Sequence, residues 1–365
     1  MTVDTLTTQA PSGPAALRAI VAQVADRAAA VDRNEIDVRP SLAEMGGAGL
    51  LSLGLTPGAV PDTPHGTGTL ADQALVIRSL AQVCTATSFS VWAHRTAVGY
   101  LASWGSEPVH RDLLPPLLRG ERAAATAMAT AFQAALGLRE LTVTSRPDRD
   151  GHLVLDGVIP WASNLHADGA VVVLPAASET GQNLVIAITT DQPGVELVPY
   201  PPLLALDATA STTVKLTGVQ VPAERVLTER FLDFLADVRP AFLLLQTALC
   251  LGLADASIAA SDPRHEGTAT TFRSDHDDLR RRRDALDAVY HRRLPADQPA
   301  DDELVRLRLE SSELAVDATR HEAAVSGGAG YLATAATSRR LREAAFLPIQ
   351  SPTEAQLRWE LSRSA

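Results

Sequence analysis

The runs Ala170-Val-Val-Val-Leu and Leu184-Val-Ile-Ala-Ile, separated by a segment that holds Ser178 and Gly181, decide the fold class. Both are short, rich in apolar and β-branched residues and bounded by turn residues, a pattern typical of strands. Runs of the same kind occur at 141–144, 152–155, 195–198 and 212–216. Because no helical segment separates them, they predict an antiparallel sheet or barrel and not alternating βαβ units.

Helical periodicity flanks these strands on both sides. In residues 15–31, apolar side chains recur at the spacing of one helix face, which predicts an amphipathic helix. The same reasoning predicts helices at 42–48, 70–84, 88–104 and 111–118, with a loop at 56–69. After the strands it predicts helices at 231–261, 279–293, 302–326, 338–346 and 354–363, the first of them kinked or restarted at Pro240.

The expected fold is therefore α+β and mostly α. A disordered polar tail at residues 1–14 precedes an N-terminal helical domain at 15–125. A middle antiparallel β-barrel-like domain follows at 126–228, and a C-terminal helical bundle at 229–365. A chain of 365 residues has room for two or three domains of roughly 150 residues each.

Composition excludes several classes of function. The net charge of −11 argues against a nucleic-acid partner, since such proteins carry a basic footprint. Cys84 and Cys250 are too few for a disulfide framework, which favours a reducing cytoplasm. The start of the chain lacks a basic and then apolar targeting pattern. The longest apolar run, 241–254, is shorter than the roughly 20 residues that span a bilayer, so we expect a buried helix and no membrane partner.

Two further kinds of site are not indicated. The chain has neither a Rossmann glycine fingerprint nor a P-loop, so nucleotide binding of those kinds is unsupported. The nine histidines are scattered along the sequence, and their spacing to acidic residues suggests no metal site. We therefore expect no metal.

Five stretches in this order resemble the acyl-CoA dehydrogenase superfamily of flavoproteins, from about residue 18 to 361. They are Leu42-Ala-Glu-Met-Gly-Gly-Ala-Gly-Leu-Leu, Trp104-Gly-Ser-Glu with Leu113-Leu-Pro-Pro-Leu-Leu-Arg-Gly-Glu, Asp156-Gly-Val-Ile-Pro-Trp-Ala-Ser-Asn-Leu-His-Ala-Asp, Val219-Gln-Val-Pro-Ala-Glu-Arg-Val-Leu, and Gly327-Gly-Ala-Gly-Tyr. The resemblance implies a flavin-dependent oxidoreductase with FAD, or alternatively FMN, as cofactor. It also implies a small organic or acyl-thioester substrate and a homo-oligomer, a dimer or tetramer.

The resemblance places several residues beside the flavin. Trp161 is expected to form a flat wall for the ring, with Ser163 at its polar edge; alternatively, Trp161 caps the sheet core. Gly327 and Gly328 have no Cβ and would approach a flavin bound mainly by a neighbouring subunit; alternatively, they form a helix C-cap. Where the family has Met-Thr-Glu-Pro, this chain has Ala127-Met-Ala-Thr-Ala, so Met128 and Ala129 are candidate flavin contacts.

The chain departs from the family at the catalytic base. Members that dehydrogenate acyl-CoA use a carboxylate, commonly in a Glu-Gly-Thr-like turn, and here that turn reads Ser351-Pro-Thr. Ser351 therefore occupies the base position, with Thr353 as a further flavin contact, although a hydroxyl is too weak a base to act unaided. Glu354 would need a register shift to serve. The Arg-x-Gln-Phe-Gly loop of the family is also missing, and Pro263-Arg-His-Glu-Gly is the nearest match.

Three functional interpretations stay open. The protein is a dehydrogenase with a relocated base, a reduced-flavin-dependent monooxygenase served by a flavin reductase, or a flavin-free scaffold or partner subunit. A dehydrogenase would pass electrons to an electron-transfer partner. His94 is a candidate for polarising substrate or stabilising oxygen chemistry, with a hydrogen-bonded structural histidine as the alternative. The arginines at 280–283 either meet CoA phosphates or form a salt-bridged helix face.

Overall fold

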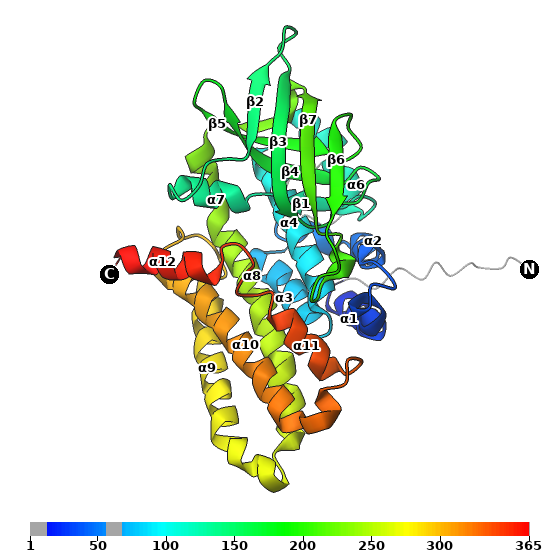
Figure 1. The fold of residues 1–365 in the computed structure, drawn as a ribbon, viewed down its shortest axis with the longest axis vertical. Coiled ribbons are helices and arrows are strands. Elements are labelled where there is room, and N and C mark those ends of the chain that lie inside the picture. The colour runs from blue at the N-terminus through cyan, green and yellow to red at the C-terminus, as the bar shows by residue number, and fades with distance from the viewer. Residues whose placement is uncertain (1–12, 56–67, 365) are drawn as a thin grey trace, which may run out of the picture.

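A mixed sheet stands at one end of the molecule and long helices form the other (Figure 1). The computed structural model describes residues 13–55 and 68–364. Its helices are α1 (Pro14–Asp32), α2 (Arg39–Gly47), α3 (Leu70–Ala81), α4 (Thr85–Trp104), α5 (Glu107–Asp112), α6 (Leu114–Leu118), α7 (Ala129–Ala135), α8 (Phe231–Ser261), α9 (Arg273–Arg293), α10 (Asp302–Gly330), α11 (Ala336–Ala344) and α12 (Glu354–Ser364). Its strands are β1 (Ala124–Thr126), β2 (Val143–Pro147), β3 (Leu153–Ala162), β4 (Val171–Ser178), β5 (Asn183–Thr189), β6 (Val195–Pro199), β7 (Thr212–Val221) and β8 (Val226–Thr228).

The α+β, mostly helical fold class is confirmed by this order of elements. Residues 1–12 of the predicted tail lie outside the described residues, and Pro14 already starts α1. The predicted loop at 56–69 falls outside them as far as residue 67. The predicted segment 111–118 consists of two short helices, α5 and α6. The domain limits at 125 and 228 stay a prediction.

The sheet is mixed, which corrects the prediction of an antiparallel one. Its strand order is β6-β7-β3-β2-β4-β5-β8, and β1 also pairs with β4. The pairs β1–β4 and β2–β4 are parallel, and the remaining pairs are antiparallel. The parallel pairs arise because α7 returns the chain after β1, and the β3 hairpin and its exit return it after β2.

Strand β4 separates two hydrophobic cores, as its alternating side chains require. Val171 and Val173 are fully buried in the helical core, whereas Val172 and Leu174 are fully buried in the core of the sheet. Strand β5 repeats this alternation. The uninterrupted apolar runs of the sequence therefore reflect strands that are covered on both faces.

Helix α8 is the centre of the bundle and packs against α3 and α10. Close approach to α3 requires Gly252, because a Cβ at that position would lie 2.3 Å from the carbonyl oxygen of Arg78. The helix runs through Pro240 without the predicted restart. By length and composition it is the one helix in the described ranges that could cross a membrane, but 83% of its most apolar window is buried inside the protein.

Candidate active site

A cavity of about 500 Å³ lies where the end of β3 meets α4, α8 and the segment after α11. That volume falls within the range of ligand pockets. Its lining is Phe89, Trp92, Ala93, Thr126, Ala127, Met128, Ala129, Thr130, Gln133, Arg139, Ile159, Pro160, Trp161, Ala162, Ser163, Leu203, Leu204, Ala205, Leu206, Ser211, Phe242, Arg342, Ala345, Phe346, Ile349, Gln350 and Ser351. The lining therefore includes the predicted residues Met128, Ala129, Trp161, Ser163 and Ser351.

Helices α4 and α8 and the segment after α11 supply an aromatic cluster to the cavity wall. Phe89 stacks on Trp92 with ring centroids 5.3 Å apart, and Phe346 meets Phe89 edge-on at 4.7 Å. Phe242 meets Trp92 edge-on at 5.1 Å. Such pairs hold one another in place and present a flat apolar surface. Sequence reasoning assigned none of these four residues to the site, although Phe89 and Trp92 share one face of α4.

Trp161, near the end of β3, is held from one side. Its ring stacks on Tyr200 with centroids 3.6 Å apart and planes 14° from parallel. The Tyr200 hydroxyl donates to the carbonyl oxygen of Pro160 and lies 2.6 Å from Thr213 Oγ1. Trp161 is nevertheless 55% exposed, which a cap on the sheet core would not be. The free part of the ring is therefore available to a ligand in the cavity.

The turn after β3 is fixed by Asn164. This residue is fully buried and adopts a left-handed conformation, with φ of 63°, which asparagine tolerates. Its amide nitrogen donates to the carbonyl oxygens of Ser90 (2.7 Å) and Ala124 (3.1 Å). Beside it, the Ser163 hydroxyl lies 2.6 Å from Ser211 Oγ. Asn164 thus ties the Trp161 turn to α4 and β1.

The segment that carries Ser351 is held from behind by a buried arginine. Arg308 of α10 donates to Gln246 Oε1 at 3.0 Å and to Gln350 Oε1 at 3.2 Å. Gln246 in turn donates to the Ser351 carbonyl oxygen at 2.8 Å. Ser351 Oγ and Gln350 Nε2 are buried without a hydrogen-bond partner among the described residues. Two orphaned polar atoms therefore border the cavity, where a ligand would satisfy them.

The described lining contains no carboxylate and no histidine; its charged members are Arg139 and Arg342. Glu354 starts α12 and accepts a 2.8 Å hydrogen bond from Arg358 Nε, so it does not line the cavity. Glu343 is buried on α11 and accepts from the hydroxyl of Thr85, at the start of α4, at 2.8 Å. Burial raises the pKa of Glu343. This carboxylate also stays outside the cavity.

His94 lies on α4 outside the cavity lining. Its Nε2 donates to the carbonyl oxygen of Leu117 at 3.1 Å, which leaves Nδ1 to accept the Ala124 backbone N–H, also at 3.1 Å. Burial lowers the pKa of His94 to about 4. The geometry is that of a neutral imidazole linking α4, α6 and β1, which matches the structural alternative for this residue.

The remaining predicted contacts lie away from the cavity. Gly327 and Gly328 are near the C-terminal end of α10, in the part of the bundle remote from the sheet (Figure 1). Gly327 has a φ of 58°, and a Cβ on either glycine would meet nothing within 4 Å, so the surface there is open. Thr353 Oγ1 accepts from the Gln356 backbone N–H at 3.2 Å and caps α12. These three assignments stay predictions.

Three of the histidines that are scattered along the sequence meet in space. His265, His276 and His321 are not scattered in space: one ring nitrogen of each lies within 4.8 Å of the others, and all three are buried. His265 and His321 are 56 positions apart in the chain. The packing of α10 against α9 and the segment after α8 brings these residues together, so sequence spacing gave no signal.

Comparison with known proteins agrees with this architecture. The family model for the acyl-CoA dehydrogenase N-terminal domain matches residues 15–121. The probable acyl-CoA dehydrogenase fadE25 of Mycobacterium leprae is 22% identical over 367 residues, covering 95% of this chain and 94% of the relative. Butyryl-CoA dehydrogenase from Megasphaera elsdenii has a TM-score of 0.83 at 16% identity, covering 96% of each chain. The prolyl acyl carrier protein oxidase AnaB has a TM-score of 0.79 at 19% identity, covering 95% of this chain and 98% of its own.

The matches indicate the class of protein. At these identities the solved structures show the fold, while the family model and the curated relatives carry the sequence relationship. Residues 15–121 match the N-terminal domain of acyl-CoA dehydrogenases, and over nearly its whole length the chain is similar to proteins of that superfamily of flavoprotein oxidoreductases.

Proposed function

We propose that this protein is a flavin-dependent oxidoreductase that binds FAD, or alternatively FMN, in the cavity beside Trp161 and acts on an acyl thioester or a small organic substrate. The observation that carries the proposal is Trp161 itself. It is 55% exposed in the wall of an apolar cavity, while Tyr200 covers its other side. A flat, supported aromatic surface of this kind is what an isoalloxazine ring requires.

The residues present fit a flavin. Trp161 and the aromatic cluster provide apolar walls, and the Ser163 hydroxyl, the Ser351 hydroxyl and the Gln350 amide provide polar atoms at the edge. A bound flavin supplies hydride transfer and, when reduced, the capacity to react with oxygen. The chain's own residues bind and orient it, and the aromatic walls exclude water from the reacting face.

Ser351 occupies the position of the catalytic glutamate in this proposal. Its hydroxyl can hydrogen-bond a substrate carbonyl, but a neutral hydroxyl is far too weak a base to remove an α-proton unaided. With no carboxylate in the described lining, rapid dehydrogenation of an acyl thioester has no base. The protein therefore works as a dehydrogenase only slowly, or performs chemistry that needs no α-proton base.

The second candidate is a reduced-flavin-dependent monooxygenase of the same superfamily. The specific observation in its favour is the same carboxylate-free wall, since oxygen transfer does not require removal of an α-proton. This candidate implies a flavin reductase as partner, whereas the dehydrogenase implies an electron-transfer partner. The substrate class is shared by the two.

The test starts from the visible spectrum of the purified protein, before and after addition of FAD or FMN. We expect flavin to bind. Anaerobic mixing with an acyl-CoA then measures flavin reduction, and an oxygen electrode with NADH and a flavin reductase measures oxygen use. Fast anaerobic reduction would support a dehydrogenase with a relocated base, and oxygen use that depends on the reductase would support the monooxygenase. A protein that binds no flavin and is silent in both assays would be a flavin-free scaffold or partner subunit.

We also propose a homo-oligomer in a cytoplasmic setting. The long helices α8 and α10 resemble those through which members of the superfamily assemble, and the open surface at Gly327 and Gly328 is available for a second copy. Light scattering should give a mass above the 38.6 kDa of one chain at micromolar concentration. A monomer under those conditions would contradict this proposal.

A further inference from the structure

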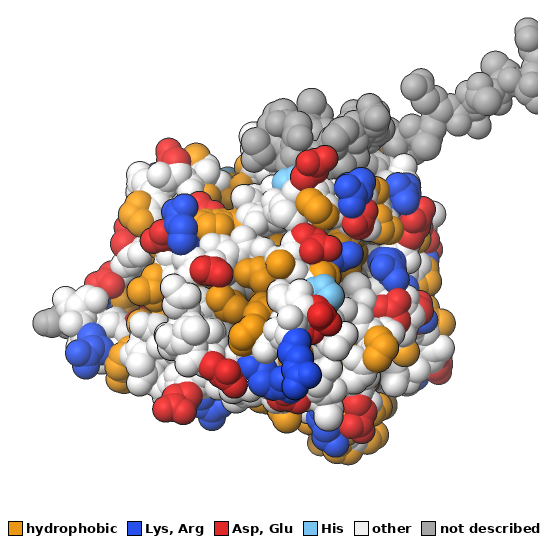
Figure 2. All heavy atoms as spheres, turned by 90° about the horizontal axis from the view of Figure 1, so that it is seen from above, with side chains coloured by type: hydrophobic (Ala, Val, Ile, Leu, Met, Phe, Trp, Pro, Cys, Tyr) orange, Lys and Arg blue, Asp and Glu red, His pale blue; other side chains and the backbone are white. Residues whose placement is uncertain are grey.

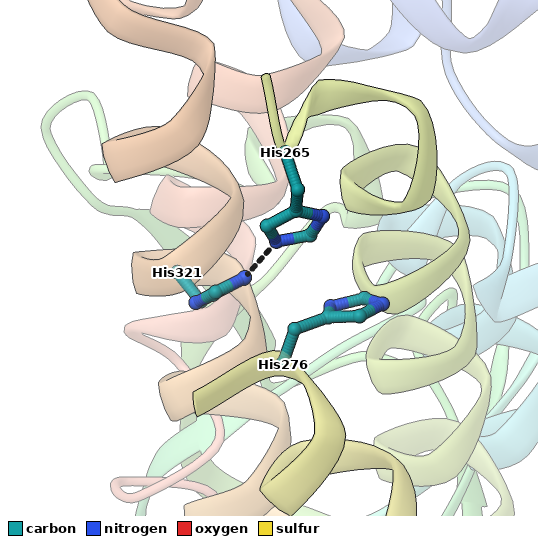
Figure 3. Close-up of side chains that lie close together, drawn as sticks. All are labelled: His265, His276 and His321. Atoms are coloured by element: carbon teal, nitrogen blue, oxygen red, sulfur yellow. Dashed lines mark hydrogen bonds between the residues drawn. The ribbon is translucent and has the colours of Figure 1, made fainter. Parts of the chain in front are cut away.

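Three buried imidazoles meet where α9 and α10 pack against the segment after α8. His265 lies between the 3₁₀ turns Asp262–Arg264 and Gly267–Phe272, His276 lies on α9 and His321 on α10. Their exposed fractions are 8%, 6% and 8%. Figure 3 shows the rings converging from three separate elements on one space.

The hydrogen bonds of this cluster leave one nitrogen unsatisfied. His276 Nε2 donates to Asp262 Oδ1 at 2.7 Å, and Arg280 holds the same carboxylate oxygen at 2.6 Å. His276 Nδ1 is buried and has no partner among the described residues. It lies on the side of the ring that faces the other two histidines (Figure 3). An acceptor lone pair therefore points into the cluster with nothing to bind.

This arrangement is the one that metal-binding histidines use. A carboxylate that accepts a proton from one ring nitrogen fixes the tautomer and directs the other nitrogen's lone pair at the metal.

The distances approach those of a tetrahedral site. His265 Nε2 and His321 Nε2 are 3.2 Å apart. Two nitrogens bound to Zn²⁺ at about 2.0–2.1 Å in tetrahedral geometry lie about 3.3 Å from each other. The three donor nitrogens lie within 4.8 Å of one another, so His276 needs to move by no more than about 1.5 Å to complete the site.

We propose that His265, His276 and His321 bind one divalent transition metal ion, with Zn²⁺ as the reference ion and Asp262 as the residue that orients His276. Imidazole donors favour this class of ion over Mg²⁺ or Ca²⁺, which prefer oxygen. The three histidines leave a fourth position for water. The ion joins α9, α10 and the segment after α8, and it stabilises the folded bundle because the unfolded chain has no preformed site. This inference does not rest on the proposed flavin chemistry.

The test uses the full chain, purified without a histidine tag and stripped with a chelator. Isothermal titration with Zn²⁺ alone should give one ion per chain, and Zn²⁺ should raise the melting temperature. His276→Ala and His321→Ala should each weaken binding by 100-fold or more, whereas Asp262→Asn should weaken it by about 10–100-fold. His291→Ala is the matched control, because His291 lies on α9 but is 63% exposed and pairs with Asp287.

The wild type alone supplies a second measurement, in case a variant fails to fold. The absorption spectrum of the Co²⁺ complex should show the visible bands of a tetrahedral nitrogen-ligated ion, and one equivalent of Zn²⁺ should remove them. No saturable Zn²⁺ binding by the wild type would overturn the proposal. So would equal affinities for the wild type and a folded His321→Ala protein, because the histidines would then form only a hydrogen-bonded cluster.

Discussion

The cavity beside Trp161 and the histidine cluster of the bundle distribute their chemical groups in opposite ways. The cavity has aromatic walls, two orphaned polar atoms and no carboxylate or histidine in its described lining. The cluster has three imidazoles and Asp262, and none of these four residues lines the cavity. Carboxylates and histidines are therefore missing from the described lining of the cavity that we propose for the flavin, whereas the bundle gathers three histidines away from that cavity.

This comparison distinguishes residues that maintain the fold from residues that determine the chemistry of the site. The Trp161 turn persists because Asn164 ties it to α4 and β1, so the platform is part of the architecture. Ser351, which we propose to occupy the base position, is one side chain on a segment that Arg308 holds through Gln350. Function must accordingly be argued from the side chains and not from the fold.

The largest expected effect comes from restoring a carboxylate in the cavity. The substitution Ser351→Glu introduces a carboxylate at position 351, in the cavity wall. A general base accelerates such a reaction by about 10²–10⁴-fold. The flavin-loaded variant should therefore be reduced by an acyl-CoA that much faster than the wild type in anaerobic stopped flow. Ser351→Gln is the matched control, since it adds the same bulk without a charge. Fast reduction by the wild type would mean that another carboxylate already serves.

His94 is a buried histidine with a structural role, in contrast to the three histidines that we propose as metal ligands. Its pKa of about 4 lies below the ordinary value of 6.5, so the unfolded chain takes up the proton first. The stabilisation is complete above about pH 6.5 and is lost as the pH falls towards 4, on the order of 3 kcal/mol in total. NMR of histidine-labelled protein should show no titration of His94 between pH 8 and 5. A midpoint near 6.5 would contradict the buried, doubly bonded geometry.

A smaller effect is expected at the aromatic wall. Trp161→Ala should weaken flavin binding by about 1–3 kcal/mol, the value of one aromatic platform and its contact area. Flavin fluorescence titration measures the change. Trp359→Ala is the control, because Trp359 lies on α12 outside the cavity lining and packs under Arg363. Equal dissociation constants for the two variants, both folded by circular dichroism, would return Trp161 to a structural role.

The sequence predicted the fold class and most of the helices correctly, but it did not predict how the strands pair. Helix α8 was predicted with its observed bounds because its apolar residues fill a whole buried helix. Strand β1 and helix α7 were missed, since Ala124–Thr126 becomes a strand only through parallel pairing with Val171, Val172 and Val173. Short alanine-rich segments carry no local preference strong enough to show this.

The residues of the candidate site also differ in whether the sequence alone could identify them. Trp161 and Ser163 could be predicted because they belong to a stretch that resembles the family's own, and Ser351 because it stands where the family has its Glu-Gly-Thr-like turn; all three line one cavity. The aromatic cluster joins residues of α4, α8 and the segment after α11, and the histidine cluster joins residues 56 positions apart. Contacts of that range depend on helix packing, which no periodicity in the sequence encodes.

The smallest expected effect concerns the arginines at 280–283, a charged run that follows His276 on α9. Arg281 pairs with Asp278 at 3.0 Å, and their side chains are 69% and 52% exposed. Arg282 and Arg283 likewise bond aspartates. Both signs of charge are also interspersed at the opposite, sheet end of the molecule, which Figure 2 shows. An exposed pair is worth about 0–1 kcal/mol, so Arg281→Ala should shift the free energy of unfolding by less than about 1 kcal/mol in urea titrations. It should also leave acyl-CoA affinity unchanged, because the arginine is already neutralised by its aspartate and lies outside the cavity lining. A tenfold loss of acyl-CoA affinity would instead assign this helix face to the CoA phosphates.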